Sequence, residues 1–112
     1  MESKERAEKI VEILDSKKGI DIETIDVTGK TTLADYFVVC SGNSTTQIKA
    51  LVDEVEYVLK NDFGILADHI EGRSGDRWIL IDYKDVVVHV FHPEERANYD
   101  ISTLWEKKGR AD

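Results

Sequence analysis

The sequence has little cysteine, little proline and no long hydrophobic run. Its single cysteine, Cys40, cannot form an internal disulfide, and its single proline, Pro93, excludes a proline-rich linker. No apolar run approaches the ~20 residues that a membrane-spanning helix needs, and the amino terminus is too charged for a signal peptide. We therefore expect a cytoplasmic protein that does not associate with a membrane.

The length and composition fit one globular domain. The chain has 112 residues, of which 41% are hydrophobic and 34% charged, a balance typical of folded chains. This length supports one apolar core and not two. We expect a single domain over residues 1–107, followed by a frayed tail over residues 108–112.

Negative charge is concentrated in the middle of the chain. The formal net charge is -8, and residues 21–72 carry ten acidic against three basic side chains, whereas residues 1–20 carry five of each. Such a domain is repelled by bare phosphate and attracted to basic surfaces. We expect a basic protein partner and no direct sequence-specific nucleic-acid binding. The alternative is that the acidity only keeps a small protein soluble.

Hydrophobic spacing predicts two main helices. Apolar residues recur at helical spacing over residues 3–18 and again over residues 45–60. Ser3 and Gly19 are suited to begin and end the first helix. Ser44 and Gln47 have the spacing of a capping box, in which the two side chains bind unpaired backbone amides. The second helix should therefore begin directly after Ser44.

Alternating or continuous apolar segments predict five strands, over residues 20–27, 36–40, 65–70, 78–82 and 86–91. A polar turn should occupy residues 71–76, and residues 94–105 should form short helical turns after Pro93. This order predicts an α/β fold with a mixed, mostly five-stranded sheet, two main helices and a short helical C-terminal tail. Two helices are too few to cover both faces of the sheet, so part of one face should be available to a partner.

The segment from Trp78 to Phe91 reads as an antiparallel hairpin with Asp82, Tyr83, Lys84 and Asp85 at its tip. Successive side chains of a strand point to opposite faces, so Trp78, Leu80 and Asp82 share one face. The second arm, residues 86–90, is apolar almost throughout and should lie inside the sheet. The face of Trp78 is either a core row that reaches the surface or a recognition row.

No group of residues predicts catalysis, a metal or a cofactor. The segment 29–32, Gly-Lys-Thr-Thr, lacks the second glycine of a phosphate-binding loop, because Thr24 stands where that glycine is required. His69, His89 and His92 do not supply the three or four converging ligands of a zinc site. The sequence has no Gly-x-Ser-x-Gly nucleophile motif. Cys40 ends an apolar run and should be a buried, inert thiol.

Aromatic residues give the best candidates for a binding site. Tyr99 and Trp105 should anchor the C-terminal tail against the core. Trp78 and Tyr83, beside a charged turn, are better suited to anchor an interface, where Trp and Tyr supply most of the binding energy. We predict a partner-binding site made of Trp78, Leu80, Asp82, Tyr83, Lys84 and Asp85.

An ordered set of short motifs over about residues 5–106 resembles one family, the ribosomal silencing factors or Iojap-like proteins. The set is Asp35-Tyr36-Phe37-Val38-Val39, Ser41-Gly42-x-Ser44 with Gln47, Glu71-Gly72, Trp78-x-Leu80-x-Asp82-Tyr83-x-Asp85, residues 86–91 (Val-Val-Val-His-Val-Phe), Arg96, Tyr99 and Leu104-Trp105. Two positions depart from the family pattern. Lys84 stands where the family usually has glycine, so the turn should be strained or of another type. Ile101-Ser102 replaces the usual Leu-Glu and removes one acid from the tail.

The resemblance implies a translation repressor without enzymatic activity. Proteins similar to this one bind the large ribosomal subunit through its ribosomal protein number fourteen and sterically block association with the small subunit. They resemble nucleotidyltransferases in topology and often form homodimers. Two alternatives stay open: a homodimeric scaffold, and a nucleotidyltransferase-like enzyme, which would need paired magnesium-binding acids on a strand that this chain does not offer.

Overall fold

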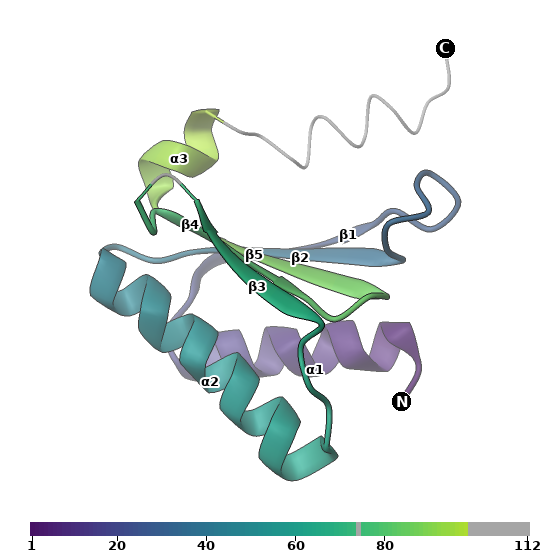
Figure 1. Cartoon of the computed structure of the whole chain (residues 1–112). Helices are drawn as coiled ribbons and strands as arrows, with labels where there is room; N and C mark the ends of the chain where they lie inside the picture. The colour runs from purple at the N-terminus through teal and green to yellow at the C-terminus, as the bar shows by residue number, and fades with distance from the viewer. Residues whose placement is uncertain (74, 99–112) are drawn as a thin grey trace.

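The structure, a computed structural model, describes residues 1–73 and 75–98. Figure 1 shows a sheet with two long helices lying against one side of it. The elements, in chain order, are α1 (Ser3–Ser16), β1 (Ile20–Asp26), β2 (Tyr36–Ser41), α2 (Thr45–Phe63), β3 (His69–Arg73), β4 (Trp78–Asp82), β5 (Val86–Phe91) and α3 (Pro93–Asn98). The predicted roles of Tyr99 and Trp105 fall outside the described residues.

The five strands form one mixed sheet in the order β1-β2-β5-β4-β3. The central pair, β2 and β5, is parallel, and each of the other neighbouring pairs is antiparallel. The prediction of a mixed α/β fold with five strands, two main helices and a short C-terminal helix is confirmed. The nucleotidyltransferase-like topology stays a prediction.

The two long helices form where apolar stripes predicted them, but α1 ends at Ser16 and Lys18, not Gly19, takes the left-handed conformation after it, with φ 62. In α2 the Ser44 Oγ accepts a hydrogen bond from the Gln47 backbone N (3.1 Å), and Gly64 ends the helix with φ 66. The Gln47 side chain accepts from the Asn43 backbone N (2.7 Å), one residue before the expected partner. Helix α1 differs from the prediction, because Glu2 occupies the N-cap position and makes no side-chain cap bond. Ser3 is therefore the first helical residue and not the cap.

The apolar stripes of α1 and α2 bury against the same side of the sheet (Figure 1). Their fully buried members include Ile10, Leu14, Ile48, Leu51 and Val55. They pack on Val38, Cys40, Ile79, Ile81, Tyr83, Val86, Val88 and Val90 from the sheet. Cys40 is fully buried, which confirms that this cysteine is a core residue, and its burial raises the pKa of the thiol to about 11. This packing leaves the opposite side of the sheet without a long helix among the described residues.

The third strand lies further along the chain than predicted. It was expected over residues 65–70, with a polar turn over residues 71–76, but β3 spans His69–Arg73. The ladder with β4 fixes this position, from the pair His69 and Asp82 to the pair Arg73 and Trp78. An edge strand needs only backbone pairing on one side, so its polar residues did not signal a strand in the sequence.

None of the helices in the described part of the chain combines the length and the apolar character needed to cross a membrane.

Candidate partner-binding surface

One group of side chains covers the side of the sheet opposite α1 and α2, and we call it the distal face. Strand register brings these residues together, because Trp78 pairs with Phe91, Leu80 with His89, and Asp82 with Val87. Strands β2 and β5 then place Phe37 beside Val87. The distal face consists of Phe37, Val39, Trp78, Leu80, Asp82, Val87, His89 and Phe91.

Stacked rings hold Trp78 in place on the distal face. Its indole stacks on Phe91, with ring centroids 4.7 Å apart and planes at 29°. Its Nε1–H donates a hydrogen bond to His89 Nδ1 at 3.2 Å, which leaves the imidazole proton on Nε2 while this bond is made. His89 also meets the edge of Phe37 at 5.1 Å. Trp78 is half-buried. It therefore belongs partly to the core and partly to the surface.

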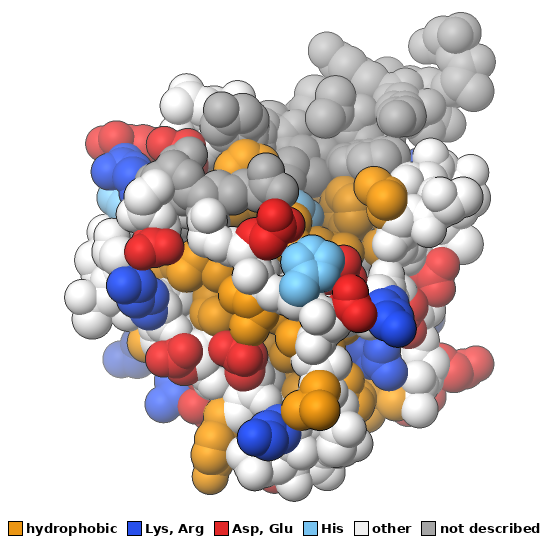
Figure 2. Space-filling model, viewed as in Figure 1, with side chains coloured by type: hydrophobic (Ala, Val, Ile, Leu, Met, Phe, Trp, Pro, Cys, Tyr) orange, Lys and Arg blue, Asp and Glu red, His pale blue; other side chains and the backbone are white. Residues whose placement is uncertain are grey.

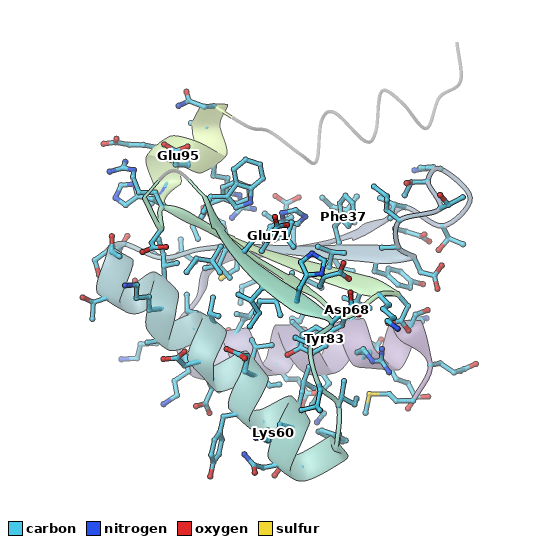
Figure 3. The ribbon with its side chains drawn as sticks, viewed as in Figure 1. Phe37, Lys60, Asp68, Glu71, Tyr83 and Glu95 are labelled. Carbon is cyan, nitrogen blue, oxygen red and sulfur yellow. The ribbon has the colours of Figure 1, made fainter. Side chains whose placement is uncertain are left out.

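A hollow of about 370 Å³ opens on the distal face, and we call it the distal hollow. It is lined by Leu33, Phe37, His69, Glu71, Leu80, Asp82, Val87 and His89. Phe37, Leu80 and Val87 give it an apolar wall, and Leu33, at 70% exposed, stands at its edge. Figure 3 shows Phe37 and Glu71 on the same side of the sheet, away from the helices. An apolar hollow beside carboxylates suits an apolar side chain flanked by basic ones.

His69 forms the polar rim of the distal hollow together with three carboxylates. Its Nδ1 lies 3.2 Å from Asp68 Oδ2 and 3.6 Å from Asp82 Oδ2, and its Nε2 lies 3.5 Å from Glu71 Oε2. The hydrogen bond to Asp68 raises the pKa of His69, and the charges of Asp82 and Glu71 act in the same direction. Figure 2 shows acidic side chains gathered around a histidine beside exposed apolar atoms. The rim is therefore acidic, and its charge depends on pH.

The same rim contains the one described group with metal-ligand geometry. The ligand atoms of Asp68, His69 and Asp82 lie within 4.8 Å of one another. These three residues could hold a cation only if the imidazole gave up its proton, which the neighbouring carboxylates oppose. Asp68 and His69 are exposed, and the group is explained by ion pairing alone.

The six predicted site residues do not lie on one common surface in the structure. Trp78, Leu80 and Asp82 lie together on the distal face, as strand alternation predicted. Lys84 is exposed at the hairpin tip, where its φ of 74 is the left-handed conformation that glycine adopts most easily. Of the two expectations for this turn, strain or another turn type, the positive φ agrees with strain. The Lys84 backbone N donates to Asp82 Oδ1 at 2.6 Å, which closes the turn.

Tyr83 and Asp85 both point to the helix side, away from Trp78, and their part in partner binding stays a prediction. Tyr83 is 3% exposed and packs in the core beneath α1 and α2, so it shares no surface with Trp78 (Figure 3). Asp85 Oδ1 accepts a hydrogen bond from Arg6 Nη1 of α1 at 2.6 Å, which makes it an anchor for that helix. Strand alternation already groups Tyr83 with Ile79 and Ile81, and this signal was available in the sequence.

Sequence reasoning missed part of the distal hollow. His69 and Glu71 were assigned to a short strand and a turn, and Val87 and His89 to the interior of the sheet. The alternation of β5 could have placed Val87 and His89 on one face. No local pattern could have placed Phe37 there, because its position depends on the parallel pairing of two distant strands.

Comparisons with known proteins agree on one family. The family described as "Ribosomal silencing factor during starvation" matches residues 1–112. The ribosomal silencing factor of Bacillus subtilis (strain 168) is 41% identical over 98 residues, which cover 88% of this chain and 82% of the relative. A crystal structure of a protein from Chromobacterium violaceum superposes with a TM-score of 0.89 at 39% identity, and the match covers 95% of this chain and 88% of that one.

A mitochondrial protein is also similar to this chain, at a lower sequence identity. A mouse protein named "Mitochondrial assembly of ribosomal large subunit protein 1" is 32% identical over 99 residues, which cover 86% of this chain and 43% of the mouse protein.

Proposed function

Because this chain belongs to the ribosomal silencing factor family, we propose that it represses translation by binding the large ribosomal subunit and blocking its association with the small subunit. The name of the mouse relative supports the choice of the large subunit, since it refers to assembly of that particle. The mechanism is steric occlusion. It needs no cofactor and no catalytic residue.

The proposed partner on the large subunit is ribosomal protein number fourteen, as the family resemblance implies. The observation that carries the proposal is the distal hollow, an apolar depression bordered by Glu71, Asp82 and Asp68. A basic protein can place an apolar side chain in this hollow and its cations on the rim. The formal net charge of -8 would also speed the encounter with a basic surface.

We propose that Trp78, Leu80, Asp82 and Lys84 make the contact. Trp78 is the anchor, because it is large, held by stacking on Phe91 and only half-buried. Leu80 supplies part of the apolar wall, and Asp82 supplies negative charge beside it. A homodimer that used the same face would compete with the ribosome for these residues.

Sedimentation through a sucrose gradient tests the proposal. Purified protein is mixed with separated ribosomal subunits, and we expect it to run with the large subunit and to reduce the fraction of joined particles. Leu80→Glu should abolish both effects by placing a charge in the apolar wall. Ile70→Glu is the matched control, since Ile70 pairs with Ile81 on the helix side of the sheet. Unchanged joining with excess wild-type protein would refute the proposal.

A further inference from the structure

The Tyr83 hydroxyl is a buried polar group that makes no hydrogen bond with the described residues. Tyr83 is 3% exposed, and its Oη has no hydrogen-bond partner among the described residues. Burying a hydroxyl without a partner destabilises a protein, so such groups are rare in native structures and call for an explanation. Burial also raises the pKa of Tyr83 to about 12, so the hydroxyl keeps its proton at physiological pH.

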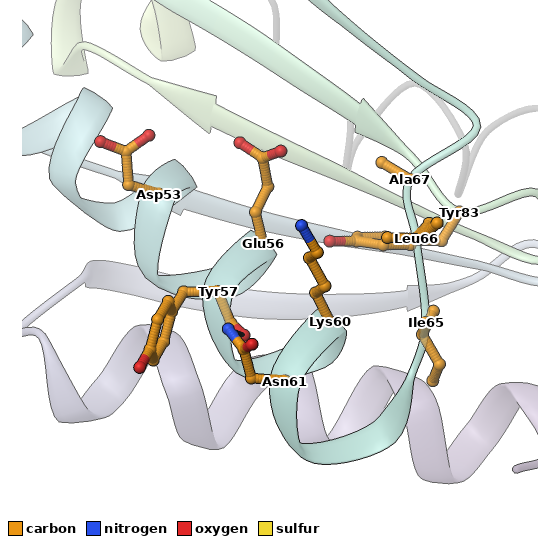
Figure 4. Close-up of a pocket in the computed structure, with 9 residues that line it drawn as sticks. All are labelled: Asp53, Glu56, Tyr57, Lys60, Asn61, Ile65, Leu66, Ala67 and Tyr83. Atoms are coloured by element: carbon orange, nitrogen blue, oxygen red, sulfur yellow. Dashed lines mark hydrogen bonds between the residues drawn. The ribbon is translucent and has the colours of Figure 1, made fainter.

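Tyr83 points into a second hollow, on the helix side of the molecule, which we call the helix hollow. It measures about 480 Å³ and lies between α2 and the segment that joins α2 to β3. It is lined by Asp53, Glu56, Tyr57, Lys60, Asn61, Ile65, Leu66, Ala67 and Tyr83. Figure 4 shows the hydroxyl directed toward the gap in which Lys60 and Glu56 end. The volume is in the range of sites for small organic groups.

The mouth of the helix hollow carries an excess of negative charge. Asp53 and Glu56 supply two carboxylates, and Lys60 supplies one ammonium group. Partial burial raises the pKa of Glu56, the negative charge of Asp53 raises it further, and Lys60 offsets this only in part. A second cation near Glu56 would therefore be stabilised.

Apolar groups surround this charge and extend beyond the hollow. Ile65, Leu66 and Ala67 line one side of the hollow, and Tyr57 also lines it, from α2, with its ring turned away from the gap in Figure 4. Tyr57 is 65% exposed and Leu66 is 68% exposed. Large exposed apolar side chains around a pocket are typical of a surface that contacts another protein.

We propose that the helix hollow binds an arginine side chain of a basic protein partner. The guanidinium donates hydrogen bonds to the Glu56 carboxylate and to the Tyr83 hydroxyl oxygen, while its aliphatic stem lies against Leu66. Arginine fits better than lysine, because its planar fork of N–H donors reaches two acceptors at once. The site lies on the opposite side of the sheet from the distal face, and it does not depend on the proposed ribosomal function.

The test uses Nα-acetyl-arginine amide as the probe and follows the backbone NMR resonances of the whole chain. We expect saturable shifts at Tyr57, Leu66 and Tyr83, and much weaker binding of the uncharged analogue Nα-acetyl-citrulline amide. Tyr83→Phe and Glu56→Gln should each weaken binding about tenfold, because each removes one hydrogen bond to a charged group. Glu8→Gln is the control, as it removes one exposed carboxylate from α1.

Stability measurements separate binding from folding. Tyr83→Phe removes only the unpartnered hydroxyl, so its Tm should rise by ~4 °C while binding weakens about tenfold. A lower Tm would show that the hydroxyl is partnered and would overturn the argument. The proposal is also overturned if the arginine probe gives no saturable shifts, if citrulline amide binds equally well, or if an acidic probe, Nα-acetyl-glutamate amide, binds instead. Tighter binding of putrescine would reassign the site to a free diamine.

Discussion

Replacing Trp78 separates its role in the fold from its role in binding. In the structure the indole makes two contacts of different kinds, a ring stack on Phe91 at 4.7 Å and an N–H hydrogen bond to His89 at 3.2 Å. Trp78→Phe keeps an aromatic ring for stacking and removes the donor, which should cost about 1 kcal/mol of stability. Trp78→Ala removes both contacts. A fully buried tryptophan costs ~3–5 kcal/mol when truncated to alanine, so this half-buried one should cost about 2 kcal/mol.

The two variants should also weaken binding, and again Trp78→Ala should weaken it more than Trp78→Phe. If Trp78 anchors the ribosomal contact, Trp78→Ala should lose about 2 kcal/mol of binding free energy, a factor of about thirty in Kd. Trp78→Phe should lose about threefold, since most of the apolar contact area remains. Thermal denaturation measures the loss of stability. Co-sedimentation with purified large subunits, at a temperature where every variant is folded, measures the loss of binding.

One outcome refutes the reasoning. If Trp78→Ala lowers Tm sharply but the folded variant still sediments with large subunits at the wild-type Kd, the indole is a core residue and not an anchor. Ile70→Ala is the matched control for the loss of a partly exposed apolar side chain. It should change Tm slightly and Kd not at all.

Three further changes test the local physics. Lys84→Gly should stabilise the chain by about 0.5–1 kcal/mol in thermal or urea unfolding, because φ 74 strains a side-chain-bearing residue, and Lys84→Ala should give no such gain. The pKa of His69, read by NMR titration, should lie above 6.5. The ion pairs of His69 with Asp68 and Asp82 then stabilise the fold fully below pH 6.5, and this stabilisation is lost as pH rises through the higher folded-state pKa. His69→Gln should remove this pH dependence of stability. Ser44→Ala should cost about 1 kcal/mol of stability by deleting the N-cap bond of α2, and an unchanged urea midpoint would contradict that.

Local sequence signals determined the parts of this protein that depend on neighbouring residues. Helix α2 followed from its apolar stripe and the Ser44 cap, which together span one continuous segment. The hairpin of β4 and β5 followed from two apolar arms and a polar turn. The ordered motifs were enough to indicate the family. Each of these signals is short-range, because helix and strand periodicity are properties of consecutive residues.

Only the tertiary structure decided which surfaces those elements form. The position of β3 was set by its pairing with β4, and the place of Phe37 beside Val87 was set by the parallel pairing of β2 and β5. Both hollows, the place of Asp82 beside His69 and the burial of the unpartnered Tyr83 hydroxyl depend on contacts between separate segments of the chain. A pattern of consecutive residues records which side of a strand a side chain occupies. It does not record which side chains of other segments face that side chain, because this depends on contacts that form only when the sheet and helices pack together.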